Sequence, residues 1–357
     1  MSDRRLLFAK RLFIIAVGAF LLTPLTFAEE TPAVKVSNVR RVFHNGEHNS
    51  FTDLVRFHQK FYLTFRSCPD GHGVHPTASI IVLASDDAQR WRQVHRFSIK
   101  YRDTRDPHFL VFKDRLFVYT GCWYSGETSI PRAEYDRNKH LGYAVSSADG
   151  EKWDGPTMLE GTFGHYIWRA ATFDGKAYLC GRRKFNFEFT PPEDLRVESL
   201  MLESDDGLIW RKRAIFQEEY GDETAFLFQP NGDIVGIGRR GSDPAQLLRS
   251  RPPYDHWHRK VLDRYVGGPL IARWGNRMIV GGRKFTDGRG AKTAMYWLAN
   301  DELHEFAELP SGGDTSYPGF IPLSSTRALM SWYSSHEKDV SGARITAVYL
   351  ADLEVEG

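Results

Sequence analysis

Arginine recurs at one position of a repeated strand, turn and strand pattern. Six segments of the chain consist of a short apolar run, a polar turn and a second apolar run, as in LIARWGNRMIVGGR and AATFDGKAYLCGR. Guanidinium groups bind carboxylates and sulfates through paired hydrogen bonds, so arginines that converge from several repeats would form a site for an anion. When the six segments are aligned on the residue that opens the second run, the position six residues later is arginine in four: Arg66, Arg182, Arg239 and Arg283.

A second set of reactive side chains stands at the start of the first apolar runs. In a hairpin the end of the second strand lies beside the start of the first, so these residues should be neighbours of the arginines. Polar groups repeated at the mouths of apolar strands suggest the floor of a ligand site. The candidates are Asp53, Arg105, Asp106, His108, Trp168, Arg169, Glu223, Gly268 and Tyr317.

Simpler explanations remain open for some of these residues. The arginines would also be explained as solvated loop charges or as ion pairs with Asp53, Asp106 and Glu223. An Asp-Pro pair often begins a turn, which by itself would account for Asp106. Tyr317 would serve equally well as a tyrosine that caps its strand by hydrogen bonding. Four arginines at one repeat position nevertheless favour an anion site over scattered charges.

All of these residues have to be positioned by β-strands. Each pair of runs is followed by a third run, such as SIIVLASDD or SLMLESDDG, and then by outer runs such as RQVHRFSIK. Runs rich in Val, Ile, Phe and Tyr and broken by Gly, Asn, Asp and Pro predict strands. Repeats of roughly 45 to 60 residues with four strands each predict propeller blades. We therefore expect an all-β fold, a six-bladed β-propeller of four-stranded antiparallel blades, as one domain over residues 29–357.

The sixth blade lacks a fourth strand of its own. The chain ends after the third run of that blade, ITAVYLADL, while an unassigned strand, VKVSNVRRVF at residues 34–43, precedes the first blade. We expect this N-terminal strand to pair with the C-terminal strand and to close the ring.

Three turns that follow third strands share a signature. The segments SDDAQRW, SADGEKW and SDDGLIW each place a serine six residues before a tryptophan, with an aspartate two residues after the serine. This pattern resembles the Asp-box, the recurring hairpin of the sialidase superfamily. The serine and aspartate of such a turn bind its backbone N–H groups, so these aspartates are expected to be structural.

Two further segments resemble the catalytic part of sialidases. DETAFLFQPNGDIVGIGRR is similar to the segment in which a glutamate opens a blade and an arginine ends its second strand, and GGDTSYPGF is similar to the segment that carries the sialidase tyrosine. The resemblance implies that Tyr317 is the nucleophile and Glu223 the base that activates it. It also implies that Arg239 and Arg283 hold the substrate's carboxylate. RDP, GGP and SGGDTSYPG are similar to segments of a bacterial group labelled sialidase-like or exo-α-sialidase.

The sequence departs from the sialidase pattern in two places. Sialidases usually carry an arginine before the first strand of the first blade, whereas this chain has FTDLV, with Asp53. Arg66 or Arg182 could substitute for it in space. The usual acid/base aspartate falls in RSCPDGHGVHPTAS, which offers Asp70, His72 and His75. Histidine titrates near neutral pH, so His75 is a workable proton donor.

These residues define a reaction class. A carboxylated anomeric carbon repels a carboxylate nucleophile, so a tyrosine deprotonated by a glutamate is the better choice. We predict an exported sialidase-like glycoside hydrolase acting on a terminal acidic sugar of a glycan or oligosaccharide, with no cofactor and no metal ion. The alternatives are a lyase for uronate-containing glycans and a non-catalytic propeller that binds acidic glycans. The predicted catalytic residues are Tyr317, Glu223, His75 and Asp53, and the predicted substrate-binding residues are Arg66, Arg105, Asp106, Arg169, Arg182, Arg239 and Arg283.

Composition and charge argue against other classes. Residues 1–28 place four basic residues before a short apolar run and end in small residues, which predicts a signal peptide and export to the periplasm or beyond. The net charge is +2 and this leader contributes +3, so the remainder is near −1 and has no general attraction to nucleic acid. No later segment approaches the roughly 20 apolar residues of a membrane span. Three cysteines allow at most one disulfide.

One glycine-rich stretch needs a separate interpretation. FQPNGDIVGIGRRG has glycines in the spacing of a dinucleotide-binding loop. Such a loop leads from a strand into a helix, whose N-terminus holds the pyrophosphate. Here the glycines lie between two expected strands, so we interpret Gly236 and Gly238 as close-packing positions near a crowded axis.

Overall fold

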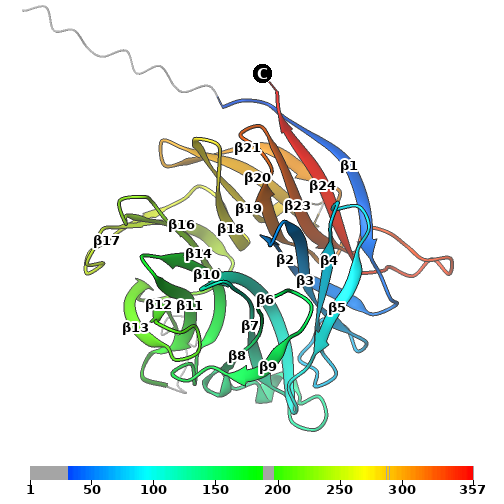
Figure 1. The fold of residues 1–357 in the computed structure, drawn as a ribbon, viewed down its shortest axis with the longest axis horizontal. Coiled ribbons are helices and arrows are strands. Elements are labelled where there is room, and N and C mark those ends of the chain that lie inside the picture. The colour runs from blue at the N-terminus through cyan, green and yellow to red at the C-terminus, as the bar shows by residue number, and fades with distance from the viewer. Residues whose placement is uncertain (1–30, 188–196, 287, 289, 357) are drawn as a thin grey trace, which may run out of the picture. The chain divides into compact units, whose positions relative to one another are not determined.

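The described part of the chain forms a ring of six antiparallel sheets (Figure 1). The computed structural model describes residues 31–187, 197–286, 288 and 290–356. Three short 3₁₀ segments, η1 (Arg132–Glu134), η2 (Arg137–Lys139) and η3 (Phe185–Phe187), interrupt the strands. The blades in chain order are β2 (His48–Phe57), β3 (Lys60–Cys68), β4 (Ser79–Ser85) and β5 (Arg92–Phe97); β6 (Arg102–Phe112), β7 (Arg115–Tyr124), β8 (Leu141–Ser147) and β9 (Asp154–Met158); β10 (Tyr166–Phe173), β11 (Lys176–Lys184), β12 (Val197–Ser204) and β13 (Arg211–Gln217); β14 (Thr224–Phe228), β15 (Ile234–Arg240), β16 (Asp243–Ser250) and β17 (Trp257–Val261); β18 (Gly267–Trp274), β19 (Arg277–Thr286), β20 (Gly290–Ala299) and β21 (Glu302–Leu309); and β22 (Thr315–Pro322), β23 (Arg327–Ser334) and β24 (Ala347–Val355), joined by β1 (Val34–Phe43).

The last blade is completed by the N-terminal strand. β1 pairs with β24 in antiparallel register, from Val34 opposite Val355 to Phe43 opposite Val348. In Figure 1 the blue strand β1 runs along the red strand β24. The expected six four-stranded blades and their closure by the N-terminal strand are therefore confirmed. The pairing ties the two ends of the described chain together through backbone hydrogen bonds.

The first strand of each blade lies on the inner side of the ring. Each first strand contacts the first strand of the next blade, and β22 contacts β2, so the contacts run through all six blades. Aromatic side chains fill the spaces between the blades: the ring of Trp274 on β18 lies 5.6 Å from that of Phe320 on β22 and stacks at 5.5 Å on Trp297 of its own blade. Buried aromatic side chains remove about 150–250 Å² each from water, which makes them a main source of stability here.

The three turns that resemble Asp-boxes are held by their own side chains. The Oδ1 atom of Asp206 accepts hydrogen bonds from the backbone N–H groups of Leu208 and Ile209, at 2.8 and 2.9 Å. Ser204 Oγ accepts one from Gly207 N at 2.8 Å. The turns at Asp87 and Asp149 have the same arrangement. These aspartates satisfy backbone donors of their hairpins.

The first strands of five blades contain the same bulge at the blade entrance. Five first strands, β2, β6, β10, β18 and β22, are out of register with their second strands by one residue at their N-terminal ends. Such bulges re-aim side chains and are frequent beside active sites. The residues at these bulges include Phe51, Asp106, Gly268 and Tyr317, all with positive φ: 62°, 51°, 58° and 53°.

The second strands end beside these bulges, as the hairpin argument predicts. Arg66 pairs with Ser50, Arg182 with Tyr166, and Arg283 with Gly267. Arg239 N donates to the carbonyl of Glu223 at 2.9 Å. The four repeat-equivalent arginines thus stand at the same end of their blades.

Other sequence-based expectations concern the rest of the chain. The expected signal peptide, residues 1–28, lies outside the described residues. Among the described residues, no helix has the length and apolar character required to cross a membrane. Cys68, Cys122 and Cys180 are buried and free. The stretch of Gly236 and Gly238 continues from β15 directly into β16 rather than into a helix.

Candidate active site

A tyrosine and a glutamate from different blades are hydrogen-bonded at the inner end of the ring. Tyr317 Oη donates to Glu223 Oε1 at 2.7 Å. Tyr317 lies in the bulge of β22, and Glu223 immediately precedes β14. The two are 94 residues apart in sequence, and both are buried, at 6% and 5% exposure. Only the ring closure of the propeller brings them together.

The carboxylate of Glu223 is fixed from its other side. Its Oε2 atom accepts from Arg239 Nη1 at 2.9 Å and from the backbone N–H of Gly268 at 3.1 Å. Gly268 has φ +58°, and a Cβ added there would lie 2.7 Å from Cδ2 of Tyr317. A side chain at this position would displace the tyrosine ring, so the glycine is required by both its conformation and the close approach.

The tyrosine is protonated in the resting protein. Burial raises the pKa of Tyr317 well above its usual value, and the negative charge of Glu223 adds to the effect. The nearby Arg239 and Arg283 act in the opposite direction. Arg239 Nη1 lies 3.5 Å from Tyr317 Oη, and the Arg283 guanidinium lies 5.4 Å from the tyrosine ring centre. A phenol with so high a pKa needs a base to accept its proton before it can act as a nucleophile, and Glu223 is the carboxylate that is hydrogen-bonded to it.

Three of the repeat-equivalent arginines surround this pair. Arg239 also forms an ion pair with Asp222, at 3.3 Å, and Arg182 hydrogen-bonds to the same carboxylate. Arg283 contacts Asp314 Oδ1 at 3.1 Å and donates to Tyr333 Oη at 2.9 Å. Their side chains are 16–21% exposed, so part of each side chain is accessible to solvent.

The fourth repeat-equivalent arginine and its neighbour support a loop. Arg66 is fully buried and donates to Asp103, Gly71 O and Gly73 O, each at 2.9 Å. Arg105 shares Asp103 and donates to the carbonyls of His72 and Gly73. The two arginines hold the segment of residues 69–78 in place. With its donors enclosed, Arg66 is unavailable to a ligand in this conformation.

Asp53 and Arg169 form an ion pair inside the ring. Arg169 Nη1 donates to Asp53 Oδ1 at 2.9 Å, and its remaining donors reach Pro269 O at 3.1 Å and Pro318 O at 2.6 Å. Asp53 Oδ2 accepts from Phe109 N at 2.9 Å. Arg169, Asp53 and the three backbone groups that they contact belong to five different blades, so this buried pair ties five inner strands together. Trp168 stands edge-on to the Tyr317 ring at 5.3 Å.

The histidines proposed from the sequence lie in different surroundings. His75 is hydrogen-bonded to Ser129, and Asp70 accepts from Thr77 at 2.5 Å. His72 instead points its ring at Phe51, at 5.6 Å, and Phe51 in turn contacts the Tyr317 ring at 4.9 Å. Of the three loop candidates, His72 is thus the one connected to Tyr317 by ring contacts. His108 is buried, which lowers its pKa to about 4.

Asp106 is a carboxyl group of the site whose pKa is raised rather than lowered. Its Oδ2 accepts from the hydroxyl of Tyr166, while its buried Oδ1 has no hydrogen-bond partner. Burial raises the pKa of Asp106 to about 7, and repulsion by Glu223 contributes, against the attraction of Arg105. A carboxyl group in this state is largely protonated at mildly acidic pH and can donate a hydrogen bond.

This shift predicts a dependence of stability on pH. Because the folded-state pKa of Asp106 lies above its ordinary value of 3.8, its contribution to stability is fully present below pH 4 and is lost as pH rises towards 7. Asp106→Asn removes the titration. The native protein loses this contribution between pH 5 and pH 8, whereas the variant does not. We therefore expect the free energy of unfolding of the variant minus that of the native protein to increase by more than about 1 kcal/mol over this range, since each pKa unit is worth about 1.4 kcal/mol. Urea unfolding at several pH values measures it, with the exposed Glu219→Gln as control. Parallel curves for the native protein and Asp106→Asn would contradict it.

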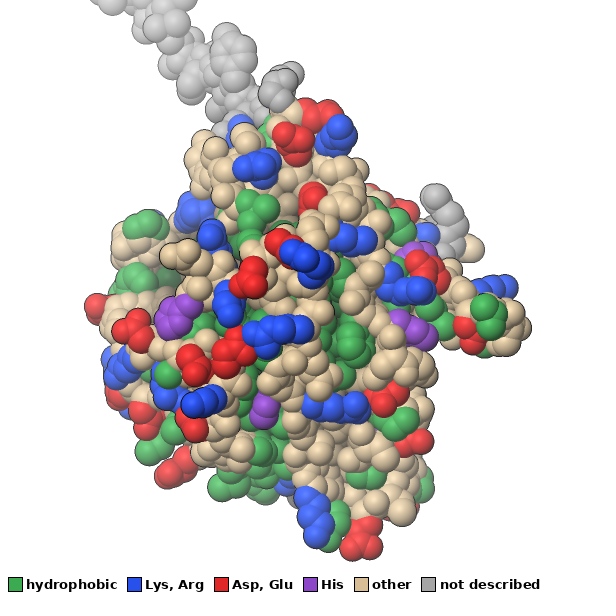
Figure 2. Space-filling model, turned by 45° about the vertical axis from the view of Figure 1, so that its right-hand side comes forward, with side chains coloured by type: hydrophobic (Ala, Val, Ile, Leu, Met, Phe, Trp, Pro, Cys, Tyr) green, Lys and Arg blue, Asp and Glu red, His purple; other side chains and the backbone are tan. Residues whose placement is uncertain are grey.

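The charges of the site almost balance. Six arginines, Arg66, Arg105, Arg169, Arg182, Arg239 and Arg283, pair with five carboxylates, Asp53, Asp103, Asp222, Glu223 and Asp314. The arginines are therefore not a free positive cluster. The face seen in Figure 2 likewise mixes acidic and basic side chains rather than gathering one sign. An anionic ligand can therefore bind only if it displaces some of these carboxylates from the arginines, or if the site acquires a further positive charge.

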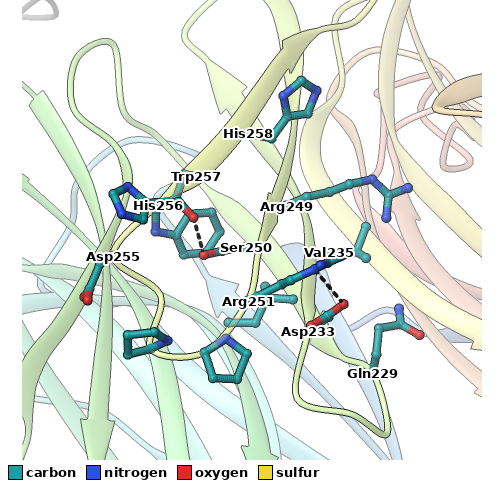
Figure 3. A pocket seen from close by; sticks show the side chains of 13 residues that line it. Gln229, Asp233, Val235, Arg249, Ser250, Arg251, Asp255, His256, Trp257 and His258 are labelled. Atoms are coloured by element: carbon teal, nitrogen blue, oxygen red, sulfur yellow. Dashed lines mark hydrogen bonds and ion pairs between the residues drawn. The ribbon is translucent and has the colours of Figure 1, made fainter.

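A polar cleft adjoins the site. It has a volume of about 260 Å³, and Arg182, Asp222, Tyr220 and Arg240 line it. A wider pocket of about 720 Å³ lies at the opposite ends of β15 and β16, around Trp257 and His256 (Figure 3). Arg251 pairs there with Asp233 at 3.5 Å. The wider pocket contains no counterpart of the Tyr317 and Glu223 pair, so we place the candidate active site at the smaller cleft.

Sequence reasoning missed several residues of this site. Asp222, Asp314, Tyr333, Phe51 and His48 were not selected as candidates. A signal existed for four of them: Tyr333 occupies the repeat position of the arginines, and Asp314, Asp222 and Phe51 lie within the segments GGDTSYPGF, DETAF and FTDLV. For His48 nothing in the local sequence marks the contact.

Comparisons with known proteins agree with this fold. No protein-family model matches the chain, and no curated protein matches it. Among solved structures, a protein of unknown function from Dyadobacter fermentans superposes with a TM-score of 0.75 at 18% identity, covering 91% of this chain and all of that one. Trypanosoma rangeli sialidase in complex with sialic acid gives 0.65 at 11% identity, covering 92% of this chain and 59% of that one. The endosialidase of phage phi92 gives 0.64 at 9% identity, covering 90% and 69%. The chain therefore has the sialidase-like propeller fold.

Proposed function

We propose that this sialidase-like propeller is an exported glycoside hydrolase that removes a terminal acidic sugar through a tyrosine nucleophile. The observation that carries the proposal is the hydrogen bond of 2.7 Å from Tyr317 to Glu223, with Arg239 bound to the same glutamate. A buried tyrosine that donates its hydroxyl hydrogen bond to a carboxylate and lies beside two arginines has the surroundings that activate a phenol as a nucleophile. The scaffold is one that sialidases share.

The proposed reaction proceeds in two displacements. In the first, Glu223 accepts the phenol proton while Tyr317 Oη forms a bond to the anomeric carbon, and the bond from that carbon to the departing oxygen breaks. The departing oxygen takes a proton from water or from a donor on the segment of residues 69–78. In the second, water bonds to the anomeric carbon as the bond from that carbon to Tyr317 Oη breaks. The proton lost by the water goes to the group that protonated the departing oxygen, and the tyrosine oxygen recovers its proton from Glu223. Arg239, Arg283 and Arg182 hold the substrate's carboxylate.

The substrate class has to be tested directly. We expect that a panel of acidic oligosaccharides and aryl glycosides of acidic sugars, analysed by mass spectrometry, will yield a released sugar that has gained one water. An unsaturated uronate product, detected by its ultraviolet absorbance, would indicate elimination instead. Saturable binding without any product would identify a non-catalytic glycan-binding protein. Neutral aryl glycosides serve as the control for the charge requirement.

A further inference from the structure

Two histidines and an aspartate converge beside Tyr317 without a role in the reaction described above. His48 begins β2, His72 lies in the segment of residues 69–78, and Asp314 precedes β22. The Oδ2 atom of Asp314 lies 3.0 Å from His48 Nε2 and 2.7 Å from His72 Nδ1. All three ligand atoms lie within 4.8 Å of one another. The histidine rings are nearly perpendicular, at 83°, so both nitrogens face the same oxygen from different directions.

We propose that His48, His72 and Asp314 bind one divalent zinc ion. Two imidazole nitrogens and one carboxylate oxygen are the donor set of many three-ligand zinc sites, in which the fourth position is open. Zinc ligands at 2.0–2.1 Å in a tetrahedron are separated by about 3.4 Å. The two nitrogens lie 3.0 and 2.7 Å from Asp314 Oδ2, so each would have to move further from that oxygen. His72, whose side chain is 53% exposed on a loop, can make that movement.

The surroundings support the Asp314 ligand. Asp314 Oδ1 accepts from Tyr333 Oη at 2.8 Å and contacts Arg283 at 3.1 Å, which leaves Oδ2 directed at the histidines. Such outer hydrogen bonds orient the carboxylate ligands of metal sites. The positive charge of Arg283 opposes the ion, and the negative charge of Asp314 offsets it.

A zinc ion at this site would supply the unpaired positive charge that the arginines lack. Phe51 contacts the rings of both His72 and Tyr317, which places the ion on the same side as the Tyr317 and Glu223 pair. His48 lies just before the segment FTDLV, where sialidases usually have their first arginine. Zinc would add two positive charges to a site whose guanidinium groups are already paired. Its open position faces solvent beside His72, where a carboxylate oxygen of the ligand could bind. This role rests on the proposed function, whereas metal binding itself does not.

Metal binding is tested on the full protein prepared without a polyhistidine tag. After chelator treatment and dialysis, titration with ZnCl₂ in a calorimeter is expected to give one ion per chain. Loss of a residue that merely supports a ligand weakens metal binding by about 10–100-fold, so we expect His72→Ala to weaken it by more than about 100-fold. CoCl₂ should produce the visible absorption bands of a tetrahedral site in the native protein and not in this variant.

The control is a histidine of the same segment. His75→Ala is expected to bind zinc like the native protein, because His75 lies outside the cluster and contacts Ser129. His72 is exposed, so its replacement leaves the fold intact, as circular dichroism would check. Absence of stoichiometric binding in the native protein, or equal binding by His72→Ala, would overturn the proposal. Because no substrate is used, this result is independent of whether the protein hydrolyses glycosides.

Discussion

Tyr317→Phe is expected to lower kcat on the substrate identified by the glycoside panel by about 10³-fold or more. The change removes only the hydroxyl that hydrogen-bonds to Glu223 at 2.7 Å, so it removes the atom that would attack the anomeric carbon. Loss of a nucleophile removes the covalent path entirely, and what remains is the contribution of binding and electrostatics. Glu223 keeps its bonds to Arg239 and Gly268, so the carboxylate is not left unpaired.

A second variant, Glu223→Gln, tests the proposed base separately from the proposed nucleophile. Glu223→Gln keeps the shape of the side chain but cannot accept the phenol proton, and loss of a general base is worth about 10²–10⁴-fold. Tyr62→Phe, a buried tyrosine at the opposite end of the first blade, is the matched control and is expected to leave kcat unchanged. Steady-state kinetics on purified, folded variants measures all three. If Tyr317→Phe retained the native kcat, the tyrosine would not be the nucleophile.

Much of the fold was predictable because it depends on local and repeated signals. Alternating apolar runs and turn residues repeat six times; the first five copies each predict four strands, and the sixth predicts three. The closing strand was predictable by counting, since the last blade lacked a strand and residues 34–43 had no partner. The register between the first two strands of a blade then placed Arg66, Arg182 and Arg283 at the blade entrances.

The partners within the site were less predictable for a physical reason. Each guanidinium chooses among carboxylates that several blades bring near it, and one-residue bulges decide which side chain points inward. Arg66 occupies the same repeat position as Arg239, yet Asp103 and two loop carbonyls enclose it while Arg239 reaches Tyr317. Repeat position thus predicted where the arginines lie, but the charge on neighbouring blades determines what they bind.

Arg66→Met is expected to reduce the free energy of unfolding by about 3 kcal/mol, at the lower end of the range for a broken buried ion pair, because Asp103 loses Arg66 but keeps Arg105 as a partner. Both Arg66 and Asp103 have fully buried side chains. The methionine would also leave the carbonyls of Gly71 and Gly73 without the guanidinium that now binds them, although Arg105 still reaches Gly73. Urea unfolding followed by tryptophan fluorescence measures the change.

An exposed ion pair serves as the control for Arg66→Met. Lys60 and Glu151 are 3.1 Å apart with side chains 36% and 37% exposed, so Lys60→Met is expected to change stability by less than about 1 kcal/mol. If Arg66→Met cost no more than Lys60→Met, Arg66 would not be the internal support of the segment of residues 69–78, and a role in ligand binding would have to be reconsidered. A large loss of stability would instead assign Arg66 to the support of the segment that carries His72, which would leave Arg182, Arg239 and Arg283 as the repeat-equivalent arginines that we propose for the ligand.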